Sequence, residues 1–502
     1  MSPATPADPG RRIVLPGVAR SFDRRLVLLI NMVPLALALI QISSVNVGLH
    51  SISQSLGAQS SDLQWVLSGY ALAFGITLVP AGRLGDAAGR GSVFVVGLGL
   101  FALASLACGL APTPLLLNLA RVCQGLGAGL QGPQTTGLIQ QYFSGQARAR
   151  AYALSGMVVA ASVAVGPVMT GSLIKAVGPE LGWRLPFLIN CPLGLLGCVC
   201  ALRWLPFESE RARRRAKAAS VKGATAGARR ERLELDPVGA ALLTGAVVSL
   251  MLPNMLGQQV GAERFWLLSG VVLGGGLWLW WEARHKARGR VPMVDLSLFQ
   301  IKSFARQTLV SALNFLGMTS VFVVLLLLLQ RGLGWEALPA SLIGLPNAIL
   351  SCAGAIWAGR QVLAKRDWLI VISLLAIVAG VLSTAGVVYL VWRHGLSPWW
   401  LMATLALSGL GQGMFGAANQ TLSMLDVPVA MAGVAGGVKS MAERCSTAVG
   451  NAIMTGVLFS LQPVAGWPEG VIAAYAGVAA AVLAALGLAW AFALRAAAAG
   501  RR

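Results

Sequence analysis

Long apolar runs separated by short polar segments dominate the chain from residue 26 onward. A helix needs about 20 mostly apolar residues to cross a bilayer, and that criterion predicts fourteen spanning helices in this sequence. The predicted spans are 26–50, 63–81, 92–111, 113–137, 151–174, 185–205, 238–256, 265–281, 305–330, 338–358, 368–391, 398–422, 430–460 and 470–494. The pattern therefore predicts an all-α membrane protein with fourteen transmembrane helices.

Composition and charge agree with a membrane protein. Of the 502 residues, 56% are hydrophobic and only 11% are charged, whereas a soluble domain carries about 25% charged residues. The net charge of +21 comes from Lys and Arg clusters between the apolar runs, which favours membrane topology over nucleic-acid binding. Placing the N-terminus inside puts most of these clusters in cytoplasmic segments. We therefore expect a multi-pass protein of the cell inner (plasma) membrane with both termini in the cytoplasm.

The same pattern divides the chain into seven segments. They are a cytoplasmic N-terminal tail (1–25), a six-helix bundle (26–205), a basic cytoplasmic linker (206–236), two inserted helices (237–282), a second cytoplasmic linker (283–304), a C-terminal six-helix bundle (305–494) and a cytoplasmic tail (495–502). The seven cysteines lack metal-site spacing and the three histidines are scattered, so no metal or other cofactor is predicted.

The two halves of the chain repeat short motifs in the same order. The second predicted span ends with "AGRLGD" from Ala81, and the tenth ends with "AGRQVL" from Ala358. "GLGAGLQGPQTT" and "AVGPVMTG" in the fourth and fifth spans match "GLGQGMFGAANQT" and "AVGNAIMTG" in the twelfth and thirteenth. These matches predict two six-helix bundles with pseudo-two-fold symmetry and two inserted helices, an architecture typical of transporters.

Several of these motifs resemble those of a known family. "GRLGDAAGRG" (82–91), "RVCQGLGAG" (121–129), "GPVMTG" (166–171), "WRLPFLINCPLG" (183–194) and "AGVAGG…ERCSTAVGNA" (432–452) are similar to motifs of the major facilitator superfamily, in its fourteen-span drug:proton antiporter branch. The resemblance covers nearly the whole chain beyond the N-terminal tail. It implies a transporter that exports drug-like compounds in exchange for protons, and we expect it to work as a monomer.

The loop between the second and third spans is a candidate conformational latch. Gly82 and Gly85 allow neighbouring helices to approach, and Asp86 can lie near a helix N-terminus, whose partial positive charge favours a carboxylate. Arg83 and Arg90 can pair with Asp86 across the tight loop. We expect this cluster to hold the cytoplasmic side closed in one conformation; the alternative is a turn with topology-setting arginines.

Arg121 in the fourth span is an intramembrane charge, which must face a cavity or a partner. Gln124 lies on the same helix face. The family resemblance implies that Arg121 links protonation to the first span, and the alternative is structural bonding to backbone carbonyls. In the fifth span, Gly166, Pro167 and Gly171 predict a bend and close packing between the two bundles, which the resemblance connects with export.

The thirteenth span carries Lys439, Glu443 and Arg444. Lys439 and Glu443 are four residues apart and can pair. If they are buried, Glu443 is the best candidate for a proton carrier in the C-terminal half. If they lie near the cytoplasmic end, they merely cap the helix.

The first span lacks the carboxylate that the resembled branch commonly has there, because Gln41 occupies its position and cannot titrate. Proton transfer could then depend on Asp62, Glu443 or His50, which titrates near neutrality. Otherwise the protein works without proton coupling. A further alternative is that Gln41, Asn46 and His50 simply line a polar cavity.

The predicted function is export of a small amphipathic molecule, and the predicted partners are that substrate, protons and the lipid bilayer, but no nucleic acid. Arg121, Lys439 and Arg444 would accommodate neutral or anionic substrates. The main alternative is uptake, or uniport without proton coupling. A membrane sensor and an integral-membrane enzyme are further alternatives. The sequence contains no catalytic constellation that would support an enzyme. The predicted substrate-binding residues are Gln41, Asn46, Gln124, Trp65, Tyr70, Asn314, Asn347, Asn419 and Gln420.

Overall fold

The computed structural model describes residues 12–13, 21–207, 236–255, 266–267 and 269–499. Most of the predicted N-terminal tail and of the linker at 206–236, and the end of the predicted C-terminal tail, lie outside the described residues. The described chain is almost entirely helical, apart from a short antiparallel pairing of β1 (Arg12–Ile13) with β2 (Phe22–Asp23).

A helix lies at each of the fourteen positions that the apolar runs predict. The N-terminal helices are α1 (Arg24–Leu56), α2 (Ser60–Ala88), α3 (Arg90–Leu110), α4 (Pro114–Tyr142), α5 (Gly145–Val177), the short α6 (Pro179–Gly182) and α7 (Leu185–Trp204). The inserted pair is α9 (Pro237–Met255) and α10 (Ser269–Ala287). The C-terminal helices are α11 (Lys302–Leu327), the short α12 (Ala337–Leu342), α13 (Leu345–Lys365), α14 (Asp367–His394), α15 (Leu401–Ser423), α16 (Ala432–Ala465) and α17 (Trp467–Ala499).

Eleven spans within the described residues are both long and apolar enough to cross a membrane. α4, α9 and α10 do not meet both criteria, so the described chain has about eleven to fourteen spanning helices. α4 is the most polar of these three because it carries Arg121 and several glutamines that lie inside the protein. α4 packs against α2 and α3, so its polar side chains find partners in protein rather than in lipid.

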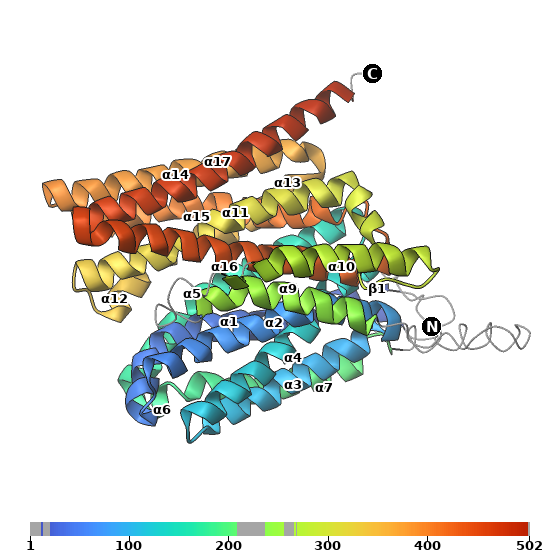
Figure 1. The fold of residues 1–502 in the computed structure, drawn as a ribbon, viewed down its shortest axis with the longest axis horizontal. Helices are drawn as coiled ribbons and strands as arrows, with labels where there is room; N and C mark the ends of the chain where they lie inside the picture. The colour runs from blue at the N-terminus through green and yellow to red at the C-terminus, as the bar shows by residue number, and fades with distance from the viewer. Residues whose placement is uncertain (1–11, 14–20, 208–235, 256–265, 268, 500–502) are drawn as a thin grey trace, which may run out of the picture.

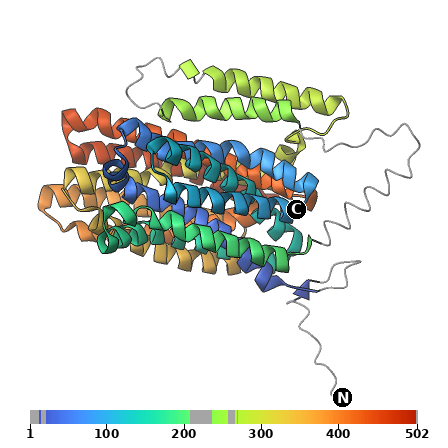
Figure 2. The same ribbon diagram turned by 90° about the horizontal axis from the view of Figure 1, so that it is seen from below.

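The helices form two groups that lie side by side (Figure 1). Helices α1–α7 make up one group and α11–α17 the other, and α2 packs against α16 while α5 packs against α13 where the groups meet. The α9–α10 pair lies along one side of this assembly (Figure 2), where α9 contacts both α2 and α16. The inserted pair therefore touches both groups through α9.

Local residues set where α1 ends and where α2 begins. α1 ends at Gly57, whose φ of +62° is the left-handed conformation that glycine adopts without strain. Asp62 then accepts a 3.0 Å hydrogen bond from the backbone N–H of Gln59, which caps the start of α2. Asp62, one of the predicted proton carriers, thus serves as a helix cap.

Candidate functional site

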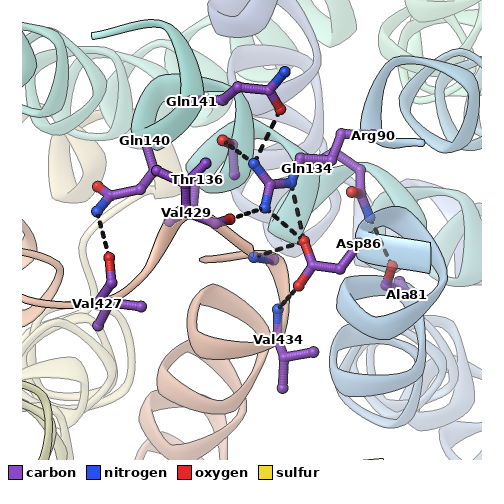
Figure 3. Close-up of polar contacts among 12 residues, drawn as sticks. Ala81, Asp86, Arg90, Gln134, Thr136, Gln140, Gln141, Val427, Val429 and Val434 are labelled. Atoms are coloured by element: carbon purple, nitrogen blue, oxygen red, sulfur yellow. Dashed lines mark hydrogen bonds and ion pairs between the residues drawn. The ribbon is translucent and has the colours of Figure 1, made fainter. Parts of the chain in front are cut away.

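A carboxylate of the N-terminal group binds the first turn of a helix in the C-terminal group. Asp86, near the end of α2, accepts hydrogen bonds from the backbone N–H groups of Gly433 at 3.2 Å and Val434 at 3.0 Å (Figure 3). Both donors belong to the first turn of α16, whose N-cap residue, Met431, provides no side-chain bond. Asp86 therefore caps α16 from the other group, where the positive end of the helix favours a carboxylate.

Arg90 holds Asp86 in place. Its Nη2 lies 2.7 Å from Asp86 Oδ1 and its Nε donates to the same oxygen at 3.0 Å. Arg90 also donates to the carbonyl of Gly137 at 2.8 Å and, across the two groups, to the carbonyl of Val429 (Figure 3). The predicted Asp86–Arg90 pairing is confirmed. Arg83, by contrast, makes no ion pair with Asp86, and its Nε is buried without a hydrogen-bond partner among the described residues.

Glycines bring the two backbones together beside this carboxylate. A Cβ on Gly82 of α2 would collide with the backbone carbonyl of Gly433, and a Cβ on Gly437 of α16 would lie 2.5 Å from the carbonyl oxygen of Leu78. Side chains at these positions would hold α2 and α16 apart. We refer to Asp86, Arg90, Gly433 and Val434 as the latch.

Two glutamines add links between the groups that the sequence analysis did not identify. Gln140 donates to the carbonyls of Met424 at 2.8 Å and Val427 at 3.1 Å, and Gln146 donates to the carbonyl of Gly359 at 2.7 Å (Figure 3 shows Gln140). The signal for them was the polar run "IQQYFSGQ", which extends from the end of α4 into the start of α5. All of these contacts lie at the same end of the molecule as the latch.

Arg121 is buried, with 1% of its surface exposed, and makes hydrogen bonds within the N-terminal group. Its Nε donates to the carbonyl of Val66 at 2.8 Å, and its Nη1 donates to Gln124 Oε1 at 2.6 Å. Gln124 in turn donates to Ser105 at 2.7 Å. The guanidinium carbon lies 4.3 Å from the centre of the Tyr70 ring, a favourable cation–π distance. The predicted proximity of Arg121 and Gln124 is confirmed.

Gln41 lies inside the N-terminal group. It is fully buried, and its Oε1 accepts a 2.5 Å hydrogen bond from Asn190 of α7. Asn46 and His50, further along α1, are exposed. The three polar residues of the first span therefore do not share one environment.

Gly166 in α5 makes its close contact with α1 and not with the other group, so the prediction of packing between the bundles is wrong at this residue. A Cβ on Gly166 would lie 2.7 Å from the carbonyl oxygen of Ile40. The hydroxyl of Ser44 donates to the carbonyl of Gly166 at 3.1 Å. α5 remains one continuous helix through Pro167 and Gly171. Other parts of α5 contact α13 and α15.

Lys439 and Glu443 form an ion pair in α16, as their spacing predicts. Lys439 Nζ lies 2.5 Å from Glu443 Oε1, and their side chains are 5% and 17% exposed. Lys439 also donates to Gln420 of α15 at 2.8 Å, while Ser311 of α11 donates to Glu443 at 2.7 Å. These charges are therefore embedded between three helices of the C-terminal group, which excludes a simple surface cap. The Arg444 guanidinium lies over the Phe74 ring of α2 at 5.2 Å.

The other predicted substrate-binding residues lie in separate surroundings. Trp65 is 39% exposed, whereas Tyr70 is buried with an unpartnered hydroxyl. In the C-terminal group, Asn314 donates to Gln412, Asn347 donates to the carbonyl of Leu405, and Asn419 donates to Gln307. Gln420 is the member of this set that contacts the Lys439–Glu443 pair.

The family model described as Major Facilitator Superfamily matches residues 32–238 and 237–451 of this chain. A probable actinorhodin transporter of Streptomyces coelicolor is 32% identical over 83% of this chain and 69% of its own length. A methylenomycin A resistance protein of the same organism is 29% identical over 89% of this chain and 88% of its own length. A tetracenomycin C resistance and export protein of Streptomyces glaucescens is 28% identical over 82% of this chain and 71% of its own length.

Solved structures share the fold. The proton:xylose symporter XylE aligns with a TM-score of 0.65 and 13% identity, covering 93% of this chain and 95% of the symporter chain. The human organic anion transporter MFSD10 aligns with a TM-score of 0.64 and 16% identity, covering 93% of this chain and 99% of the other.

Proposed function

Because the chain belongs to the Major Facilitator Superfamily of membrane transporters, we propose that it exports small amphipathic organic compounds, such as drugs or natural products, by alternating access. Similarity to proteins named for antibiotic resistance and export supports this proposal. The observation that carries alternating access is the latch, which joins the two helix groups through contacts that can break as a unit.

The proposed topology has fourteen spans. Residues 26–205 and 305–494 form the two six-helix bundles, and α9 and α10 cross the membrane as the inserted pair. The distribution of Lys and Arg supports a cytoplasmic location for both termini and for the latch. With the latch formed, the cytoplasmic side is closed, so this conformation would expose the substrate site to the outside. The working unit is proposed to be a monomer.

Proton coupling is proposed to depend on Glu443. Protonation of this carboxylate would remove the ionic partner of Lys439 and change the charge held between α11, α15 and α16. A buried charge left without its partner is unstable, so binding of a proton would favour a rearrangement of α16. Because the first turn of α16 is the part that Asp86 caps, such a rearrangement would reach the latch directly.

His50 and Asp62 are weaker candidates for the proton carrier. Asp62 caps α2 through the N–H of Gln59, and exposed His50 lies on α1. The hydrogen bonds of Asp62 stay within the N-terminal group, whereas Glu443 lies on α16, the helix that Asp86 caps from the other group.

The alternative function is uniport or import of a small organic or anionic solute without proton coupling. Gln41 favours it, because this buried amide stands in the first span and cannot titrate. Arg121 and Arg444 also favour anions, since neither makes an ion pair with a carboxylate among the described residues.

Transport in proteoliposomes tests the two functions against each other. Purified protein would be reconstituted with an imposed pH gradient and a panel of amphipathic aromatic compounds, both neutral and anionic. We expect gradient-driven transport in the wild type, its loss in Glu443→Gln, and its retention in the matched amide control Asp62→Asn. Loss in His50→Ala alone would assign the proton to His50, and transport that ignores the gradient in every variant would refute the antiport mechanism.

A further inference from the structure

Two buried carboxylates lie together where the inserted helix pair meets the following segment. Asp236 immediately precedes α9 and is 2% exposed, and Glu282 in α10 is 1% exposed. A Cβ on Gly239 would contact Asp236 Oδ2 and would lie 3.0 Å from Glu282 Oε1. The two acids therefore face each other across a residue that has no side chain.

Hydrogen-bond donors converge on these acids. Trp281 Nε1 donates to both oxygens of Asp236, at 2.9 and 3.1 Å, and the N–H of Gly239 donates to Asp236 Oδ1 at 2.9 Å. Glu282 Oε1 accepts from Trp278 Nε1 at 2.9 Å and from the N–H of Val294 at 3.4 Å. Glu282 Oε2 is buried and has no partner in the described part of the chain.

No cation neutralises the two acids within the described residues. Lys286 pairs with Asp295 at 2.6 Å instead, Arg284 lies over the Trp280 ring, and the His285 ring lies 5.7 Å from the ring of Trp281. α9 has no charged residue of its own. The helices α2 and α16 pack against α9, and their charged residues make no ion pair with either acid. These residues are Asp62, Arg83 and Asp86 on α2 and Lys439, Glu443 and Arg444 on α16.

We propose that Asp236 and Glu282 form a proton-binding site in the inserted helix pair, separate from the Lys439–Glu443 pair, with the bound proton on Glu282 Oε2. Two carboxylates in one buried site cannot both ionise without a large cost. The donor pattern agrees with this assignment, because both N–H groups on Glu282 point to Oε1 and leave Oε2 as the free position. Asp236, whose two oxygens both accept N–H donors, is the ionised partner.

This site is connected to the junction of the two helix groups. Val294, whose N–H binds Glu282, belongs to an apolar cluster that also contains Leu243 of α9 and Val434 and Val438 of α16. Val434 is also a latch residue. Loss of the proton would place two negative charges beside this cluster, and their repulsion would push Glu282 away from Asp236.

Infrared spectroscopy of the full-length protein in lipid tests the proposal without any transport measurement, so its outcome is independent of the proposed function. We expect the C=O stretching band of a protonated carboxylic acid at neutral pH. The frequency of this band should shift in D2O, where deuterium replaces the acid proton. The band should be lost in Glu282→Gln and retained in Asp295→Asn, which removes the neighbouring acid that is already paired with Lys286.

Asp236→Asn provides the second variant. This variant removes the negative charge that keeps Glu282 protonated. As the pH is raised, the band of Glu282 should therefore disappear at a lower pH in Asp236→Asn than in the wild type. A band that persists in Glu282→Gln would overturn the proposal. So would a spectrum that shows ionised Glu282 at neutral pH and changes only when sodium or calcium is added, since the site would then bind a metal cation.

Discussion

Replacing Asp86 by Asn should open the latch. The change keeps the size of the side chain but removes the charge that accepts from Gly433 and Val434 at 3.2 and 3.0 Å. Hydrogen bonds to a charged group contribute about 1.5–3 kcal/mol each, and Asn retains one acceptor oxygen. A net loss of one such bond changes the equilibrium between closed and open latch by about 10- to 150-fold. Because Asp86 and Arg90 are almost fully buried, solvent would weaken this effect little.

Distances between spin labels would measure the equilibrium. The labels would be placed at Ala87 and Ala430, exposed residues on the two sides of the junction, after replacement of the seven native cysteines. We expect Asp86→Asn to shift the distance distribution toward longer values in lipid nanodiscs. Asp62→Asn is the matched control, since it makes the same chemical change at the other end of α2, where the carboxylate accepts from the N–H of Gln59 in the same group. An unchanged distribution in Asp86→Asn would refute the assignment of the closing energy to this carboxylate.

Three further predictions concern packing, stability and pH. Gly437→Val should separate the helix groups in the same label measurement because its Cβ would strike the α2 backbone, whereas Gly456→Val on the same helix, where a Cβ meets nothing within 4 Å, should leave the distances unchanged. Arg121→Gln should lower the thermal unfolding temperature in detergent, since each buried acceptor left unpaired costs about 1–3 kcal/mol; an unchanged temperature would contradict the bonding role of Arg121. For Asp295, burial raises the pKa, but the hydrogen bonds from Lys286 and Ser297, together with the charge of Lys286, outweigh it and hold the pKa below its usual value. A carboxylate with a lowered pKa stabilises the fold above the ordinary Asp value of about 3.9, and this contribution is lost as the pH falls below that value. Asp295→Asn should therefore reduce the fall in unfolding temperature on acidification. An equal fall in both proteins would count against the pairing.

The helices could be predicted from the sequence because apolar runs of spanning length are a local property. The ion pair of Lys439 with Glu443 was also predictable, since residues four apart in a helix lie on one face. The sequence left open whether this pair was buried, which depends on α11 and α15. The sequence predicted that Asp86 binds a helix N-terminus but not which helix provides it, because α16 begins more than 300 residues later.

Contacts to backbone carbonyls were the hardest to predict. Gln140 and Gln146 bind carbonyl oxygens of the other helix group, and every residue has a carbonyl, so no sequence pattern marks the acceptor. The pairing of Asp236 with Glu282 was missed for a related reason. Each acid stands at the edge of an apolar run and has the appearance of a boundary residue until the fold of α9 against α10 brings them together.

The chemistry of the latch suits a contact that must break in every transport cycle. When the groups separate, Asp86 keeps Arg90, because both residues belong to the N-terminal group. The N–H groups of Gly433 and Val434 can pass to water, which commonly satisfies the free donors at a helix start. Opening therefore loses the two bonds to Asp86 and the bond from Arg90 to the carbonyl of Val429, but it leaves no charge unpaired. A latch made of opposite charges on the two groups would strand a buried charge instead, at a cost of about 3–5 kcal/mol. Keeping the cation and the carboxylate in one group avoids this additional cost of opening.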